Sequence, residues 1–194
     1  MTEISIIVPV YNEKDNIKPF LERLEKVLGK IGKSYEIIFS LDPSKDNSEE
    51  VILQEIKRNK NIRLLVFSRR FGQPAATMAG ILNSRGSYSV IIDVDLQDPP
   101  EIIEEMYKKI VTGYDVVYAK RRSRKGETFL KKIISSTGYY LINKLSDINI
   151  PKNTGDYRII SKKIVNELKK LKEVHGFLRG MVSYVGFKQT YVEY

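Results

Sequence analysis

The order of apolar and polar residues along the chain predicts strands that alternate with helices. The first apolar run, residues 4–10, is almost uninterrupted, as expected of a strand buried on both faces of a parallel sheet. From Ile17 to Ile31, apolar residues recur every three or four positions, which predicts an amphipathic helix capped by Asn12. These residues therefore form one predicted strand–helix unit.

The same alternation continues to about residue 120. Further strands are predicted at 35–41, 62–68, 88–93 and 116–119, and helices at 48–60, at 73–83 and from Pro99 and Pro100 to Gly113. Elements of this length predict an open, mostly parallel α/β sheet with right-handed crossovers and flanking helices. Ligands bind such sheets beyond the carboxyl ends of the strands, here after Val10, Leu41, Ser68 and Asp93.

After residue 120 the pattern is less regular. Residues 121–125 form a predicted basic loop, residues 129–145 an amphipathic helical stretch, and residue 155 begins a mixture of short strands and helices. The helical stretch mixes aromatic and aliphatic residues with lysines, so it fits either an interfacial helix on an anionic bilayer or a core helix. No composition break or repeat divides the chain, and we expect one domain, residues 1–194.

Composition and charge narrow the classes of function. The 33 Lys and Arg residues against 24 Asp and Glu give a net charge of +9, which favours phosphates, nucleic acid or an anionic membrane as partners. The absence of cysteine excludes disulfides and thiolate chemistry, and a single histidine, His175, excludes a histidine-rich metal site. No apolar run approaches the roughly 20 residues that span a bilayer, so any membrane contact is expected to be peripheral.

Two carboxylates follow the fourth predicted strand. Asp93 and Asp95 are two positions apart, a spacing that lets both side chains leave a strand on the same side. Carboxylate oxygens suit Mg²⁺ or Mn²⁺, and Gln97 offers one more oxygen. Two aspartates at this spacing also occur at ordinary solvated strand ends. The position at the ligand-binding edge of an α/β sheet is what favours a metal and phosphate site.

Five segments can be compared with known families, namely Val8-Pro9-Val10-Tyr11-Asn12-Glu13, Asp93-Val94-Asp95-Leu96-Gln97-Asp98-Pro99-Pro100-Glu101, Gly155-Asp156-Tyr157-Arg158, residues 67–73 and residues 177–180. Together they resemble family 2 glycosyltransferases of the GT-A fold, and in particular the polyprenyl-phosphate glycosyltransferase group. The resemblance implies a Rossmann-like GT-A domain in which residues 1–120 bind a nucleotide sugar and residues 121–194 face the acceptor and the membrane. It also implies inverting transfer of a hexose to a polyprenyl phosphate at the cytoplasmic face of the membrane.

The resemblance assigns roles to individual residues. Asp156 becomes the candidate catalytic base or orienting group for the acceptor. The residues expected to bind the donor are Pro9, Tyr11, Glu13, Asp42, Arg69 and Asp93. The residues expected to hold Mg²⁺ or Mn²⁺ are Asp93, Asp95 and Gln97. The residues expected to bind phosphate or the acceptor, through guanidinium groups that match phosphate oxygens, are Arg121, Arg122 and Arg179.

One departure from the family pattern concerns the nucleotide base. Relatives commonly carry two aspartates in the second loop, whereas this chain has only Asp42, within Ser40-Leu41-Asp42-Pro43-Ser44. A UDP-sugar donor is favoured, and GDP-mannose stays open. Relatives also continue past the position of Tyr194 into transmembrane helices, so we expect this chain to be soluble and to lack the membrane anchor.

Two other functions compete with this interpretation. The same fold and donor could serve a polysaccharide or soluble sugar acceptor, although the absence of tryptophan argues against the processive synthases. A non-catalytic nucleotide- or nucleic-acid-binding module would use the positive charge, but acidic residues stand at the strand ends where such a module needs basic and aromatic ones. The expected partners are therefore a nucleotide sugar, a polyprenyl phosphate and a membrane surface, without nucleic acid. A homo-oligomer stays open.

Overall fold

The structure is a computed structural model that describes residues 2–122, 154–171 and 178–194. These residues form one seven-stranded sheet in the order β3-β2-β1-β4-β6-β5-β7. The strands are β1 (Ile4–Val10), β2 (Tyr35–Leu41), β3 (Ile62–Val66), β4 (Tyr88–Ile91), β5 (Val116–Lys120), β6 (Thr154–Ser161) and β7 (Gln189–Glu193). The helices are α1 (Lys14–Ile31), α2 (Ser48–Arg58), α3 (Gln73–Leu82), α4 (Ile102–Ile110), α6 (Lys162–Leu168) and α7 (Leu178–Tyr184).

Only β6 runs against its neighbours. It pairs antiparallel with β4 and β5, while every other strand pair of the described sheet is parallel. The predicted open, mostly parallel sheet is confirmed.

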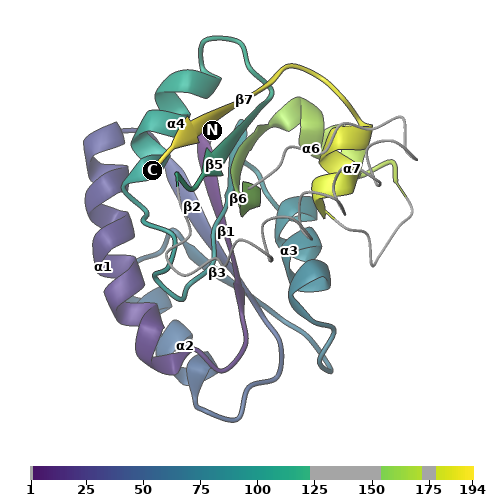
Figure 1. The fold of residues 1–194 in the computed structure, drawn as a ribbon. Helices are drawn as coiled ribbons and strands as arrows, with labels where there is room; N and C mark the ends of the chain where they lie inside the picture. Colours follow the sequence, from purple (N-terminus) through teal and green to yellow (C-terminus); the bar gives the residue numbers. More distant parts are fainter. Residues whose placement is uncertain (1, 123–153, 172–177) are drawn as a thin grey trace, which may run out of the picture.

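Helices cover both faces of the sheet (Figure 1). Helices α1, α2 and α4 lie on one face, and α3, α6 and α7 lie on the other. Along β1, Ile6 and Val8 belong to the first apolar cluster, whereas Ile7 belongs to the second. Alternate side chains therefore enter two separate cores, which is the physical reason that β1 is apolar at almost every position.

The predicted bounds of β1 and β2 match the structure, but two strands are shorter than expected. β3 ends at Val66 rather than Ser68, and β4 ends at Ile91 rather than Asp93. The loops that follow them begin earlier, so Asp93 belongs to a loop and not to a strand.

The prediction that Asn12 caps the first helix is wrong. The helix begins after Glu13, and no side-chain hydrogen bond caps it. The Oδ1 atom of Asn12 instead accepts a hydrogen bond of 2.9 Å from the backbone N–H of Lys45. Because Asn12 Oδ1 accepts this bond from the loop after β2, it does not cap the first helix.

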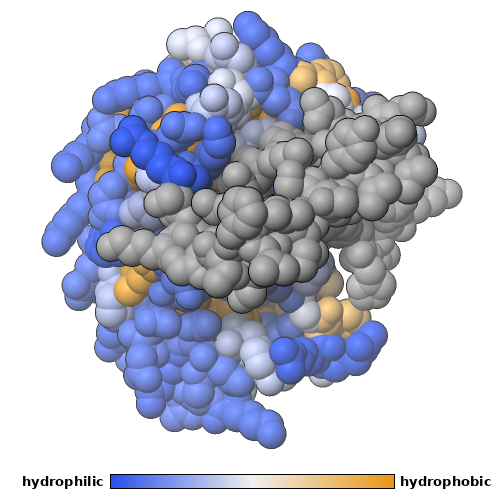
Figure 2. Space-filling model, viewed as in Figure 1, coloured by the Kyte–Doolittle hydropathy of each residue, from blue (hydrophilic) through white to orange (hydrophobic). Residues whose placement is uncertain are grey.

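The amphipathic stretch 129–145 lies outside the described residues. Within the described ranges, no helix combines the length and apolar character needed to cross a membrane. On the face shown in Figure 2, the described surface is mostly hydrophilic, with small and separate hydrophobic patches.

Candidate active site

A pocket of about 260 Å³ opens beyond the carboxyl ends of β1, β2 and β4. Its position follows the rule for open α/β sheets. The residues that line it are Pro9, Val10, Tyr11, Glu13, Asp42, Arg70, Gly72, Gln73, Ala76, Asp93, Val94 and Asp95. The fold thus brings together six of the residues singled out from the sequence, namely Pro9, Tyr11, Glu13, Asp42, Asp93 and Asp95.

The loop after β1 is held by side chains of the loop after β2 and of the start of α2. The backbone N–H of Asn12 donates to Ser44 Oγ at 3.0 Å, and that of Glu13 donates to Ser48 Oγ at 3.1 Å. These two serines therefore fix the backbone that carries Tyr11 and Glu13 into the pocket.

Asp42 anchors a third loop to the pocket. Its side chain is buried, and its two carboxylate oxygens accept hydrogen bonds from the backbone N–H groups of Phe71 and Gly72, at 3.0 and 2.8 Å. Gly72 has φ of +88°, a left-handed conformation that favours glycine. Each carboxylate oxygen has a second lone pair, so Asp42 can still accept a hydrogen bond from a ligand.

Two adjacent arginines of this loop behave differently. The Arg70 guanidinium lies over the ring of Tyr11, 3.9 Å from its centroid, and Arg70 lines the pocket. Arg69 lies over the ring of Phe71 at 4.0 Å and does not line the pocket. The sequence pointed to Arg69 because nothing in an Arg-Arg pair shows which side chain turns inward.

Asp93 and Asp95 lie in the turn that follows β4, not on the strand as predicted from their spacing. Gln73, at the start of α3, donates from Nε2 to Asp93 Oδ1 at 2.7 Å. The backbone N–H of Gln97 donates to Asp95 Oδ1 at 3.0 Å. Both carboxylates still reach the pocket, but the Gln97 side chain is exposed and does not line it.

Negative charge accumulates around Asp93. Burial, together with the charges of Asp95, Asp156 and Asp98, raises the pKa of Asp93 to about 6. A bound cation would relieve this repulsion, and two carboxylates suit Mg²⁺ or Mn²⁺, which keep positions open for water and phosphate oxygens. Within the three described ranges, no three acidic or histidine side chains make a metal site by themselves. The residues present fit an ion whose coordination the substrate completes.

The antiparallel pairing of β6 with β4 brings Asp156 to the same place. Ile91 pairs with Arg158. Because the two strands are antiparallel, Asp93, two residues after Ile91, comes next to Asp156, two residues before Arg158. The charge of Asp156 acts on Asp93, as expected for close neighbours. A predicted catalytic residue from the second half of the chain is thereby placed beside the predicted metal ligands.

Two arginines hold Asp156. Its Oδ1 atom accepts hydrogen bonds from Arg179 Nε at 3.0 Å and from Arg158 Nη2 at 3.4 Å. Arg158 is fully buried and also donates to the carbonyl oxygen of Gly155 at 2.9 Å. Arg158 was given no positioning role from the sequence, although a charged residue next to the apolar pair Ile159 and Ile160 is a usable signal of a buried, partnered side chain.

Arg121 and Arg122 lie apart from the pocket lining. Arg121 donates from Nη2 to Asp98 Oδ1 at 2.6 Å and from Nε to Tyr194 Oη at 3.0 Å, and these bonds raise the pKa of Arg121. Arg122 donates its backbone N–H to the carbonyl oxygen of Tyr194 at 2.8 Å, and its side chain is exposed. Their phosphate-binding roles stay predictions.

Comparison with known proteins gives three related findings. Residues 5–169 match the family model of Glycosyl transferase family 2. The uncharacterized glycosyltransferase YkcC of Bacillus subtilis is 46% identical over 192 residues, which are 99% of this chain and 59% of that protein. The bactoprenol glucosyl transferase of Shigella phage SfV is 36% identical, over 99% of this chain and 62% of that protein. The chain spans about three fifths of the length of these relatives.

Solved structures share the fold. The mannosyltransferase PcManGT from Pyrobaculum calidifontis, in complex with GDP-Man and Mn²⁺, superposes with a TM-score of 0.69 at 15% identity, over 98% of this chain and 55% of that one. Glucosyl-3-phosphoglycerate synthase from Mycobacterium tuberculosis, in complex with Mn²⁺, UDP and phosphoglyceric acid, gives 0.66 at 16% identity, over 99% and 68%. At these identities the likeness speaks for the fold alone, and it confirms the predicted GT-A architecture.

Proposed function

Because the chain belongs to glycosyl transferase family 2, we propose that it transfers a hexose from a nucleotide-diphosphate sugar to a polyprenyl phosphate at the cytoplasmic face of a membrane. The observation that carries the proposal is the pocket itself. It gathers Tyr11, Glu13 and the aspartates Asp93 and Asp95 at the ligand-binding edge of the sheet. The choice of acceptor is supported by the relatives named bactoprenol glucosyl transferase, which align with 99% of this chain.

The pocket suits the nucleotide part of the donor. Its volume of about 260 Å³ lies just below the roughly 300–1,000 Å³ typical of complete ligand sites, so part of the donor would extend beyond it. Tyr11 offers a ring face for the base, and Glu13 and Asp42 offer hydrogen-bond acceptors for the base and ribose. The sugar would then extend towards Asp156, the carboxylate next to Asp93. A UDP-sugar is the favoured donor, with GDP-mannose as the alternative.

Asp93 and Asp95 would hold Mg²⁺ or Mn²⁺, and Gln97 would join them through a change of side-chain conformation. When bound, such an ion supplies positive charge against the developing charge of the leaving diphosphate. Gln73, which donates to Asp93, keeps that carboxylate directed into the pocket. The arrangement resembles the magnesium sites of other phosphate-handling enzymes, where one or two carboxylates suffice.

The transfer would be a single displacement with inversion. An oxygen of the acceptor phosphate forms a bond to the anomeric carbon while the bond from that carbon to the diphosphate oxygen breaks. The nucleoside diphosphate leaves with the electron pair. Asp156, held by Arg179 and Arg158, would orient the acceptor, whose phosphate is already ionised and has little need of proton removal. Arg179 would also contact the acceptor phosphate, and Arg121 and Arg122 would add positive charge at the entrance.

The function can be tested by acceptor and donor profiling. The chain is incubated with radiolabelled UDP-glucose, UDP-N-acetylglucosamine or GDP-mannose, with undecaprenyl phosphate in detergent, and with Mn²⁺, Mg²⁺ or EDTA. We expect label in the organic extract with one donor, only when a divalent ion is present. Label on glucose or an oligosaccharide, but not on the lipid, would replace the proposed acceptor. No transfer to any acceptor would contradict the proposal.

A further inference from the structure

We propose that Arg70 binds the diphosphate of the donor, and that it leaves the ring of Tyr11 to do so as the nucleotide enters. The inference deepens the proposed function and rests on it. It assigns a role to a residue of the segment 67–73 that had received none from the sequence, where Arg69 was the candidate.

The charge of the pocket lining motivates the proposal. Four of the lining side chains are carboxylates, Glu13, Asp42, Asp93 and Asp95. Among the lining residues that the structure describes, Arg70 is the sole side chain with a permanent positive charge. A nucleoside diphosphate brings further negative charge into this acidic site. A divalent ion on two aspartates would offset part of it, and a guanidinium in the same pocket lining can form paired hydrogen bonds with phosphate oxygens.

The position of Arg70 is compatible with such a movement. The backbone that follows it is fixed, because Asp42 accepts hydrogen bonds from the N–H groups of Phe71 and Gly72. The Arg70 side chain is exposed, and its guanidinium lies 3.9 Å from the centroid of the Tyr11 ring. A cation–π contact at an exposed site is weaker than a charge-assisted hydrogen bond to phosphate. Exchange of one for the other is therefore favourable.

The exchange has a second consequence for Tyr11. The guanidinium covers one face of the Tyr11 ring, and a nucleotide base that stacked on this face would have to take its place. Removal of Arg70 should therefore uncover the base site while it removes the phosphate contact. Affinity for a nucleoside and affinity for its diphosphate are predicted to respond differently, which separates this role from a purely structural one.

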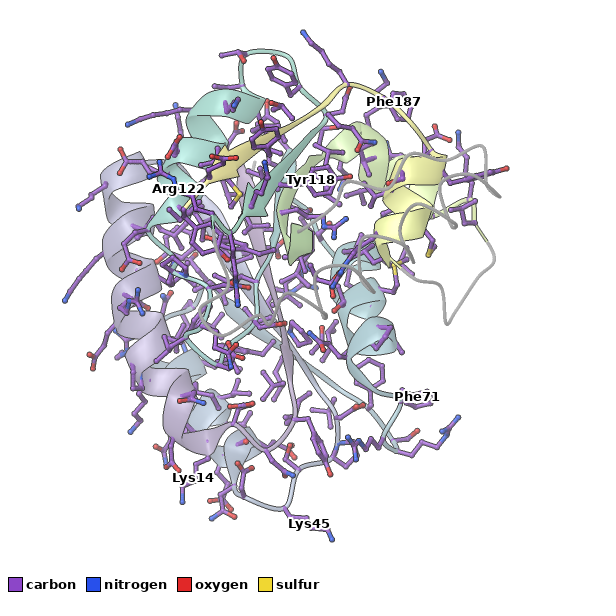
Figure 3. All side chains as sticks on the ribbon, in the orientation of Figure 1. Lys14, Lys45, Phe71, Tyr118, Arg122 and Phe187 are labelled. Atoms are coloured by element: carbon purple, nitrogen blue, oxygen red, sulfur yellow. The ribbon has the colours of Figure 1, made fainter. Side chains whose placement is uncertain are left out.

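The neighbouring Arg69 is the natural rival. Its guanidinium lies over Phe71, and Phe71 packs against Phe67 with ring centroids 5.5 Å apart. Arg69 thus belongs to an aromatic cluster outside the pocket lining. Figure 3 labels Phe71 on the side of the molecule where α3 begins, away from the loop that carries Lys45.

The test compares Arg70→Ala with the unchanged chain by calorimetric titration. The probes are UDP and GDP, each with Mn²⁺, and the nucleosides uridine and guanosine. We expect Arg70→Ala to weaken the preferred diphosphate about tenfold or more, the size expected for loss of a charge-assisted hydrogen bond. We expect the affinity for the matching nucleoside to be unchanged within about twofold or to increase. Arg70→Lys keeps the charge but not the planar fork, so its affinity for the diphosphate should lie between those of Arg70→Ala and the unchanged chain.

Lys45→Ala is the matched control. Lys45 is exposed, lies in the loop after β2 and does not line the pocket. Its replacement removes one positive charge and should leave the affinity for the diphosphate within about twofold. Retained nucleoside binding in Arg70→Ala reports that the pocket is still folded.

Three results would overturn the inference. They are an unchanged diphosphate affinity in Arg70→Ala, an equal loss for nucleoside and diphosphate, and a diphosphate-specific loss in Arg69→Ala instead. Each of these requires that the unchanged chain binds UDP or GDP, so the proposed function would survive. Failure of the unchanged chain to bind either diphosphate would reject the proposed function and this inference together.

Discussion

At the scale of single residues, several side chains of the pocket have both a structural role and a proposed role in ligand binding. Asp42 anchors the loop at Phe71 and Gly72 and also lines the pocket. Asp95 closes its own turn by accepting from the backbone N–H of Gln97. A change of such a residue to alanine would remove both roles at once, so isosteric substitutions are the informative ones.

Asp156→Asn should abolish most transfer without unfolding the chain. The asparagine keeps an oxygen that can accept the hydrogen bond from Arg179, but it loses the negative charge that holds this guanidinium in place for the acceptor phosphate. Turnover is expected to fall about 10²-fold or more, the cost of a misplaced reactant. The measurement is the initial rate of lipid-linked sugar formation, with the melting temperature and the donor affinity as controls. Near-normal turnover would remove Asp156 from the mechanism.

Asp95→Asn should weaken the binding of the metal ion. The Oδ1 atom can still accept from the N–H of Gln97, so the turn is retained while one charged ligand is lost. We expect the Mn²⁺ concentration for half-maximal UDP binding to rise at least about tenfold, as expected for the loss of an anionic ligand to a hard cation. Calorimetric titration of Mn²⁺ in the presence of UDP measures this shift. An unchanged Mn²⁺ dependence would place the ion elsewhere.

At the scale of elements, the close approach of α3 to β1 positions the loop that carries Arg70. Gly80 makes this approach possible, because a Cβ atom there would lie 2.4 Å from Ile7 Cγ2 and 3.0 Å from Ser40 Oγ. Ile7 is fully buried, so the contact cannot relax into solvent. Helix α3 and the end of β1, which carries Pro9, are thereby held in one arrangement.

Gly80→Ala should therefore destabilise the chain, by about 1–3 kcal/mol, as overpacked cores do. Gly29→Ala is the matched control, since Gly29 is an exposed position within α1 and no atom lies within 4 Å of the added Cβ. That change should stabilise the chain by about 0.5–1 kcal/mol through helix propensity. Urea unfolding of both variants measures the difference. Equal effects of the two substitutions would show that α3 is not tightly packed on β1.

At the scale of the whole molecule, a buried carboxylate joins distant segments at the end of the sheet opposite the pocket. Glu36 on β2 accepts hydrogen bonds from Ser5 Oγ at 2.7 Å, from the N–H of Arg85 at 2.7 Å and from Arg63 Nη1 at 2.6 Å. These partners come from β1, β3 and the loop before β4. Burial by itself would raise the pKa of Glu36, but the hydrogen bonds outweigh it and lower the pKa.

This lowered pKa predicts a pH-dependent stability. The contribution of Glu36 is fully present above the unfolded pKa of about 4.3 and is lost as pH falls through the lower folded pKa. The difference in unfolding free energy between the unchanged chain and Glu36→Gln should therefore be larger at pH 7 than at pH 3. Urea unfolding at both pH values measures it. Glu22→Gln, an exposed change on α1, should show a small difference at both, and a pH-independent gap for Glu36→Gln would contradict the prediction.

Much of the fold and part of the site were determined by the sequence itself. The bounds of β1 and β2 follow from their mostly apolar runs, because a strand buried on both faces keeps few polar positions, here Ser5, Glu36 and Ser40. Residues at strand ends, such as Tyr11 and Asp93, could be assigned to one site because all parallel strands end at the same edge of the sheet. The apolar pattern of each strand, together with the rule that parallel strands end at one edge of the sheet, was therefore enough to predict these features.

Only the tertiary structure decided which side chains share contacts across the chain. It brought Arg70 rather than Arg69 to the pocket, turned Asn12 from its own helix to Lys45, and placed Asp156 beside Asp93 through the antiparallel register of β6. Each outcome depends on partners many residues away and on the φ and ψ angles of loops. Spacing along the sequence contains no record of either, because loop side chains follow no fixed period.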